Sequence, residues 1–109
     1  RYNESLFGTT NIVLPSKHQN AKHVFHLYVI RVQNRSQMQL HLKENGISTG
    51  IHYPTALPFM KAYDYLDHIP EDFPVAHQYM DKILSIPMFP ELNKENIDYI
   101  SKIIKTINI

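Results

Sequence analysis

The sequence predicts an α+β fold, in which a small mixed or antiparallel sheet has helices packed on it. Residues 23–32 are rich in β-branched and aromatic side chains, which favours a strand. Residues 93–109 repeat isoleucine at helical spacing, which favours an amphipathic helix. The chain has 109 residues, of which 43% are hydrophobic and 19% are charged, so it can bury one core. We therefore expect residues 1–109 to form a single domain.

The segment 23–32, with the sequence HVFHLYVIRV, is expected to be the central strand of the sheet. Successive side chains of a strand point to opposite faces, and both faces of this segment are apolar. One face carries Phe25, Leu27 and Val29, and the other carries His26, Tyr28, Ile30 and Val32. His26 is therefore expected to be a buried, structural residue.

A helix and a second strand are predicted to follow the central strand. Asn34 or Ser36 can cap the start of the helix, and Gly46 stands where a left-handed residue ends one. Residues 47–51, with the sequence ISTGI, then favour a strand. The order of strand, helix and strand predicts a βαβ-like unit.

The next part of the chain alternates short elements with turns that contain proline. Residues 59–66 favour one or two amphipathic helical turns. Residues 75–84 favour a helix, because Pro74 suits the first helical turn. Residues 85–90 are apolar and contain prolines, so they are expected to form an edge strand or an extended segment.

Both ends of the chain are expected to be helical. The first six residues are compatible with a helix that Gly8 ends, so the chain is expected to begin inside an element. Asn93 is expected to cap the last helix. The apolar stripe of that helix consists of Ile97, Ile100, Ile103, Ile104 and Ile107.

Composition and charge argue against several classes of function. The formal net charge is +1 and the basic residues are scattered, so nucleic acid is not an expected partner. The chain has no cysteine, which excludes disulfides and thiolate metal sites and suits a reducing compartment. The longest apolar run, residues 24–30, is too short to cross a bilayer. We expect a cytoplasmic protein with no membrane partner.

The familiar catalytic and metal-binding motifs are missing from the sequence. His23 and His26 would lie on opposite faces of a strand, and no two histidines have the four-residue spacing of a helical zinc site. No serine lies in a Gly-x-Ser-x-Gly turn, and the three glycines form no phosphate-binding loop. We expect no metal and no catalytic residue in this chain.

His52 and Tyr53 are the residues that the sequence singles out as a candidate binding site. They end a short β-branched segment, and Pro54 restricts the backbone directly after them. In one interpretation they are an ordinary strand end, with a packed tyrosine and an exposed or hydrogen-bonded histidine. In the other they face a ligand or a partner domain, with the imidazole and the phenol available as hydrogen-bonding groups. Residue types and spacing leave both interpretations open.

The chain also resembles a known family over roughly residues 6–105. The resemblance is to the C-terminal segment of the DegT/DnrJ/EryC1/StrS sugar aminotransferases. It is carried by motifs that occur in the same order and spacing as in that family. These motifs are HVFHLYVIR, GISTGIHYP, KAYDYL, DFPVA, ILSIPMFPEL and IDYI.

The resemblance implies the small domain of a fold type I aminotransferase that depends on pyridoxal phosphate (PLP). Such an enzyme moves an amino group, usually from glutamate, onto a keto sugar linked to a nucleotide, and it is a homodimer. The Schiff-base lysine and the other cofactor-binding residues belong to a large domain that is absent from this chain. The resemblance therefore implies no cofactor bound by this segment alone and no catalytic residue within it.

By the same resemblance, His52 and Tyr53 match a His-Tyr-Pro motif on the wall of the sugar-nucleotide pocket. Many family members continue with Pro-Leu-His, whereas this chain has Ala56, Leu57 and Pro58, so no third polar contact is assigned. An exposed apolar surface is expected where the large domain would pack. The residues expected to contribute to it are Tyr28, Ile30, Ile86 and Met88.

A different class of function is compatible with the same predicted elements. A stand-alone domain of ferredoxin-like shape, which binds a ligand or a protein without catalysis, would also have a βαβ-like order and a compact size. The sequence upstream of Arg1 discriminates between the two. A preceding segment of about 250 residues with a Schiff-base lysine would indicate the aminotransferase.

Overall fold

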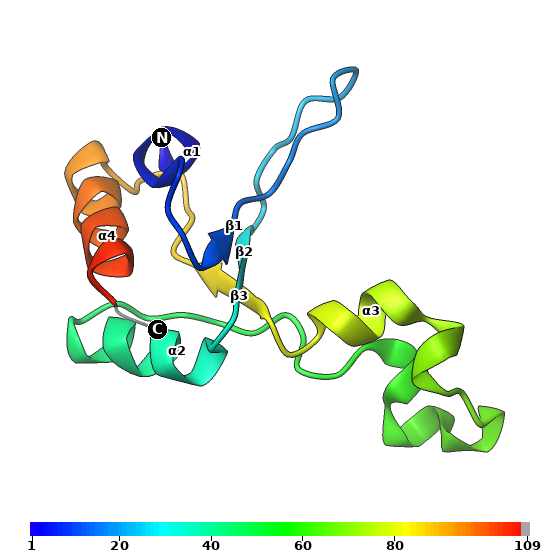
Figure 1. Ribbon diagram of the computed structural model, residues 1–109. Coiled ribbons are helices and arrows are strands. Elements are labelled where there is room, and N and C mark those ends of the chain that lie inside the picture. Colours follow the sequence, from blue (N-terminus) through cyan, green and yellow to red (C-terminus); the bar gives the residue numbers. More distant parts are fainter. Residues whose placement is uncertain (108–109) are drawn as a thin grey trace.

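The computed structural model describes residues 1–107 and contains three strands, three short 3-10 helices and four α-helices in these residues. Figure 1 shows α1, α2 and α4 gathered around the sheet, and two segments that extend away from it. The elements are, in chain order, α1 Tyr2–Leu6, β1 Ile12–Val13, β2 Tyr28–Val32, α2 Arg35–Glu44, η1 Leu57–Phe59, η2 Lys61–Leu66, η3 Pro70–Asp72, α3 Pro74–Tyr79, β3 Ile83–Ile86 and α4 Lys94–Thr106.

The sheet is antiparallel and has the strand order β1-β2-β3. The predicted α+β class is therefore confirmed, and β2 is the central strand as the sequence predicts. Tyr28, Ile30 and Val32 of β2 are buried, whereas the residues between them are only half-buried. This alternation directs one face of the sheet to the core and leaves the other, outer face partly open.

The core lies between the inner face of the sheet and helices α1, α2 and α4. Met38 and Leu42 lie one helical turn apart on α2 and are both fully buried, so this face of the helix packs on the sheet. The complete set of buried apolar residues is Tyr2, Leu6, Tyr28, Ile30, Val32, Met38, Leu42, Ile47, Leu84, Ile86, Ile100 and Ile104.

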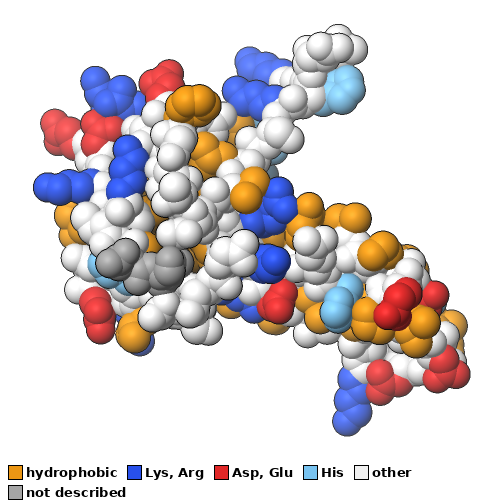
Figure 2. Space-filling model, viewed as in Figure 1, with side chains coloured by type: hydrophobic (Ala, Val, Ile, Leu, Met, Phe, Trp, Pro, Cys, Tyr) orange, Lys and Arg blue, Asp and Glu red, His pale blue; other side chains and the backbone are white. Residues whose placement is uncertain are grey.

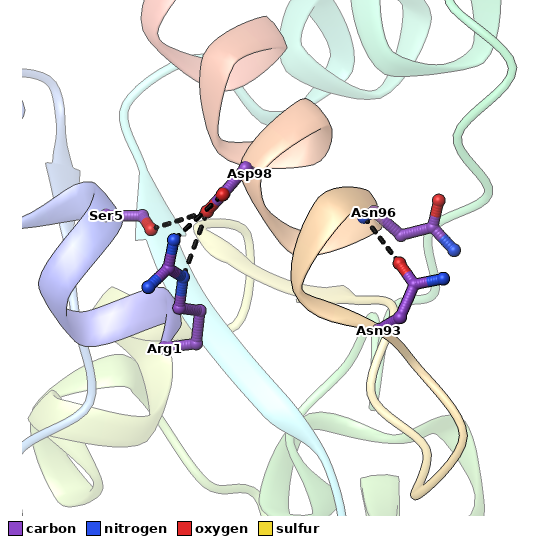
Figure 3. A network of polar contacts seen from close by, with 5 residues as sticks. All are labelled: Arg1, Ser5, Asn93, Asn96 and Asp98. Carbon is purple, nitrogen blue, oxygen red and sulfur yellow. Dashed lines mark hydrogen bonds and ion pairs between the residues drawn. The ribbon is translucent and has the colours of Figure 1, made fainter.

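Polar contacts tie α1 to α4, as Figure 3 shows. Arg1 donates two hydrogen bonds to the carboxylate of Asp98, at 3.0 and 2.8 Å, and Ser5 donates a third at 3.4 Å. The hydrogen bond from Arg1 lowers the pKa of the Asp98 carboxyl.

The start of α4 is capped as the sequence predicts. The Asn93 side chain accepts a hydrogen bond from the Asn96 backbone N–H at 2.8 Å, which confirms the predicted cap of α4.

Two tyrosines fix the position of α1 against the sheet. The Tyr2 hydroxyl donates to the carbonyl of Pro87 at 2.8 Å, and the Tyr28 hydroxyl donates to the side-chain oxygen of Asn3. The two tyrosine rings pack with centroids 4.8 Å apart. Burial raises the pKa of Tyr28 to about 12. The phenols thus remain neutral donors at any physiological pH.

Two segments extend from the core and contain no buried residue. We call residues 14–27 the hairpin arm and residues 53–82 the helical arm, which contains η1, η2, η3 and α3 (Figure 1). The radius of gyration is 15.4 Å. A compact chain of this length would have a radius of gyration of about 13 Å. The arms therefore make the molecule more open than a self-contained domain.

The predicted strand 23–32 is too long, because β2 begins only at Tyr28. Residues 23–27 belong to the hairpin arm, where no neighbouring strand is available to pair with them. Phe25 adopts a left-handed backbone conformation with φ of 51°, which interrupts any extended run. The expectation that His26 is buried is wrong, since this residue is exposed.

The predicted strand 47–51 and the βαβ-like unit are also not formed. Residue Gly50 makes one isolated antiparallel bridge to Ser85 of β3, and the rest of the segment is irregular. The N–H of Ile47 bonds back to the carbonyl of Leu42 at 2.9 Å, so the chain is still closing the end of α2 at this point. Gly46 has a φ of 77°, as its predicted role in ending that helix requires.

The predicted helix 75–84 is shorter in the structure, where α3 ends at Tyr79 and β3 begins at Ile83. Residues 83–86, with the sequence ILSI, pair along β2 as a strand. This tertiary pairing, and not the helical spacing of the segment, determines their conformation. Of the four residues expected on an exposed apolar surface, Met88 is half-buried and the other three were assigned wrongly. Tyr28, Ile30 and Ile86 are buried in the core.

Candidate functional site

The candidate site lies on the outer face of the sheet. The register pairs Val29 with Ser85 and Arg31 with Ile83, so these four side chains share the face opposite the core. Two of them are polar, which is unusual for the centre of a small sheet. Ser85 is buried, with an exposed fraction of 5%. A buried hydroxyl in this position requires a hydrogen-bond partner.

That partner is the imidazole of His52. Its Nδ1 atom and the hydroxyl oxygen of Ser85 are 2.8 Å apart and form a hydrogen bond. The bridge between Gly50 and Ser85 brings the segment before His52 against β3, with N···O distances of 3.0 and 2.8 Å. The sheet edge therefore fixes both the backbone and the ring of His52.

Gly50 makes room for this ring. A Cβ atom at position 50 would lie 2.8 Å from Cε1 of His52, which is closer than side chains normally pack. Any residue other than glycine would push the imidazole away from Ser85. Sequence reasoning identified His52 but not these two supporting residues. The signal that could have indicated Gly50 is its type and position: it is a glycine, and it stands two residues before His52.

Tyr53 lies beside His52 and is directed to solvent. Its side chain is 72% exposed, and its ring meets the imidazole edge to face at a centroid distance of 5.4 Å. The peptide bond between the two residues is cis. Of the two residues that the sequence singled out, the structure thus anchors His52 to the sheet and leaves Tyr53 exposed to solvent.

The described residues also lack a metal-binding cluster and a membrane-spanning helix. Within residues 1–107, no group of three or more histidine or carboxylate side chains could hold a metal ion. None of the lysines in this part of the chain is buried. No helix among these residues is long and apolar enough to span a membrane.

The comparison with known families identifies the class of this chain. The model of the DegT/DnrJ/EryC1/StrS aminotransferase family matches residues 1–105, and the chain belongs to this family.

Curated relatives are longer proteins that match this chain over about a quarter of their own length. The erythromycin biosynthesis sensory transduction protein EryC1 of Saccharopolyspora erythraea is 38% identical over 95% of this chain and 28% of its own. The dTDP-3-amino-3,6-dideoxy-alpha-D-galactopyranose transaminase of Aneurinibacillus thermoaerophilus is 33% identical over 89% of this chain and 25% of its own.

Solved structures share the fold, and one of them is named as a putative sugar aminotransferase. DesV of S. venezuelae, in complex with a ketimine intermediate, aligns over 95% of this chain and 28% of its own with a TM-score of 0.85 and 27% identity. The putative sugar aminotransferase Spr1654 of Streptococcus pneumoniae, in its PMP form, aligns over 96% of this chain and 27% of its own with a TM-score of 0.83 and 27% identity. The small α+β arrangement therefore occurs within larger aminotransferases.

Proposed function

We propose that residues 1–109 form the C-terminal small domain of a longer, PLP-dependent aminotransferase. The complete enzyme transfers an amino group from glutamate to a keto sugar linked to a nucleotide. The observation that carries this proposal is the family match over residues 1–105 together with relatives that are named as nucleotide-sugar transaminases. The lack of cysteine suits an enzyme of the cytoplasm.

The cofactor-binding residues lie outside this chain in the proposal. When bound, PLP supplies an electron sink that stabilises negative charge on the carbon next to the amino group. A cofactor-binding lysine needs a partly enclosed position with groups that hold a phosphate and a pyridine ring. The lysines of the described residues are exposed, except Lys82, which is half-buried. The exposure of nearly all of these lysines supports the proposal that the Schiff-base lysine belongs to the large domain.

The partner surface for the large domain is the helical arm in this proposal. The segment 53–82 has no buried residue, and its own packing consists of partly exposed ring contacts such as those of Phe59 with Phe73 and His77. Figure 2 shows hydrophobic side chains gathered along this arm, with acidic side chains at its end. The exposed apolar residues of the arm are Tyr53, Leu57, Met60, Tyr63, Tyr65, Leu66, Ile69, Phe73 and Val75. The assembled enzyme is a homodimer of such two-domain subunits.

His52 and Tyr53 contact the sugar nucleotide in the proposed enzyme. If Ser85 donates its proton to Nδ1 of His52, then Nε2 carries the ring proton and is available to donate to a substrate oxygen. The exposed phenol of Tyr53 supplies a second donor and a ring face. Both residues bind and orient substrate, and neither takes part in bond making.

The test is amino transfer by the full-length protein. Incubation with PLP, glutamate and nucleotide-linked keto sugars should give 2-oxoglutarate and an amino sugar nucleotide in equal amounts, as measured by mass spectrometry. The coding sequence upstream of Arg1 should contain about 250 further residues with a lysine whose replacement by alanine abolishes transfer. No transfer with any keto sugar nucleotide, or no such upstream segment, would reject the proposal.

A further inference from the structure

A polar cavity lies near the candidate site but does not include it. Its volume is about 320 Å³, at the lower end of the range of about 300–1,000 Å³ that is usual for small-molecule sites. It lies between the strands β1 and β2 and the end of α3. Figure 2 shows basic side chains where the two arms leave the core. The polar residues that line the cavity are Asn11, Arg31, Gln33, Gln78, Tyr79 and Lys82.

Arg31 is held in this cavity from two sides. Its backbone lies in the central strand, opposite Val13 of β1 and Ile83 of β3, so its Cα position is fixed by both neighbours. Its guanidinium group stacks on the ring of Tyr79 at 4.0 Å from the centroid. Stacking on one flat face leaves the N–H groups at the edge of the guanidinium free to donate in its plane.

The second cation, Lys82, is placed by the turn between α3 and β3. The N–H of Val32 bonds to the carbonyl of Lys82 at 2.9 Å, and the N–H of Lys82 bonds to the carbonyl of Tyr79 at 2.9 Å. Arg35 donates to the carbonyls of Met80 and Ile83, at 2.7 and 3.3 Å. These hydrogen bonds attach the turn to β2 and α2, and Lys82 and Arg31 line the same cavity.

The cavity has two cations and no carboxylate among the residues that line it. Neither Arg31 nor Lys82 forms an ion pair within residues 1–107. The strands that form its wall come from residues 5–43, a stretch of the sequence without one aspartate or glutamate. Asp81 is adjacent to Lys82 in the chain but is exposed and not part of the lining. The local charge is thus positive and uncompensated.

We propose that this cavity is an oxyanion-binding site, which takes a phosphate or carboxylate group of a small molecule. The planar guanidinium of Arg31 matches two oxygens of either group, and the Lys82 ammonium adds a point charge. The side chains of Asn11, Gln33 and Gln78 supply neutral amide donors around the anion. Because the cavity shares the outer face of the sheet with Ser85 and its partner His52, a bound anion would lie beside the candidate site.

The test measures anion binding by the full-length protein, saturated with PLP so that the cofactor site is filled. Pyrophosphate and glutarate are titrated separately by calorimetry, because one represents a phosphate source and the other a carboxylate source. We expect at least one of them to bind. Arg31→Gln and Lys82→Gln should each weaken that binding roughly tenfold to a hundredfold, as the loss of a charged hydrogen bond implies.

Two further variants serve as controls. Lys61→Gln removes an exposed lysine of the helical arm that is outside the cavity, and it should bind the anion like the wild type. Arg31→Lys keeps the charge and loses the planar fork, so it should bind with intermediate affinity. If Arg31→Gln does not fold, Lys82→Gln still gives the comparison.

Three results would overturn the assignment. The wild type could bind neither anion, or the Arg31 and Lys82 variants could bind as tightly as Lys61→Gln. A crystal structure of the full-length protein could also show a carboxylate side chain of the same protein in contact with Arg31. The titration has no amino-transfer step, so its failure leaves the proposed function standing, and the converse also holds.

Discussion

The core and the helical arm of this molecule both contain large apolar side chains, which are buried in the core and exposed in the arm. Ile30 in the core is completely buried, whereas Tyr65 in the arm is 74% exposed and Leu66 is 49% exposed. The core has a sheet and three helices that cover each other's apolar faces. The arm has 3-10 turns and one short helix, whose ring contacts, such as Phe59 with Phe73, leave no residue of the arm buried. A region of this kind is folded by contacts with another surface, which the proposed large domain supplies.

The largest effect is expected from a truncation in the core. Ile30→Ala removes a fully buried side chain from the central strand, and it should lower the free energy of unfolding by about 2–5 kcal/mol. Leu66→Ala in the helical arm is the matched control. This variant should change the free energy of unfolding by at most about 0.5 kcal/mol in the isolated chain. Urea unfolding of both variants measures the difference. Equal losses would mean that the arm packs as tightly as the core.

The attachment of the helical arm to the core gives the next largest effect. Arg35 donates to the carbonyls of Met80 and Ile83, which lie at the return of the arm to the sheet. Arg35→Ala should lower the free energy of unfolding by about 1.5–3 kcal/mol, because charged hydrogen bonds to half-buried carbonyls are lost. Arg35→Gln keeps one donor and should lose less. Hydrogen exchange should show faster opening of residues 79–83. Unchanged exchange in that turn would refute this role of Arg35.

The surface of the helical arm should affect association more than stability. The double variant Leu57→Lys and Val75→Lys puts charge on side chains that are 66% and 61% exposed. The isolated chain should self-associate through the apolar arm, and the double variant should do so less, with the free energy of unfolding changed by at most about 0.5 kcal/mol. Analytical ultracentrifugation tests this. A wild-type chain that stays monomeric at high concentration would contradict the exposed-surface account.

The smallest effect is expected at the contact between α1 and α4. The pKa of Asp98 is lowered in the folded chain by the hydrogen bond from Arg1, so its contribution to stability is present above the unfolded value of 3.8. That contribution is lost as the pH falls through the lower, folded value. Asp98→Asn should therefore be slightly less stable than the wild type at neutral pH, and the gap should close in acid. Because the pair is exposed, added salt should also reduce it. A gap that widens in acid would contradict this assignment.

The sequence predicted features that depend on neighbouring residues. Asn34 and Asn93 cap helices, and Gly46 ends one, because these roles are local backbone chemistry. The hydrophobic pattern also identified Tyr28, Ile30 and Val32 as one face of a central strand. The two-residue periodicity of a strand was enough to predict this face, since β1 and β3 pair on either side of β2 and make it the central strand.

The features that sequence reasoning missed depend on distant contacts. The strand β1 is only two residues long, and pairing with β2 alone defines it. The strand β3 begins inside a segment with helical spacing, and its register with β2 overrides that preference. His52 was found as a candidate from its neighbours, but its hydrogen bond to Ser85 joins residues 33 positions apart. No local pattern indicates such a contact.

The central claim is that the sheet presents His52 and Tyr53 to the sugar nucleotide, and half-reactions of the full-length protein test it most directly. Single-turnover absorbance of the cofactor separates the step with glutamate from the step with the keto sugar nucleotide. His52→Ala should weaken the sugar step roughly tenfold to a hundredfold, and Tyr53→Phe about twofold to tenfold. The glutamate step should stay near the wild-type rate in both.

Tyr65→Phe is the control for this measurement, because Tyr65 is equally exposed but lies away from the site. It should leave both half-reactions unchanged. The account predicts losses confined to the sugar step for the two site variants. Equal losses in both steps, or no loss in either, would contradict it.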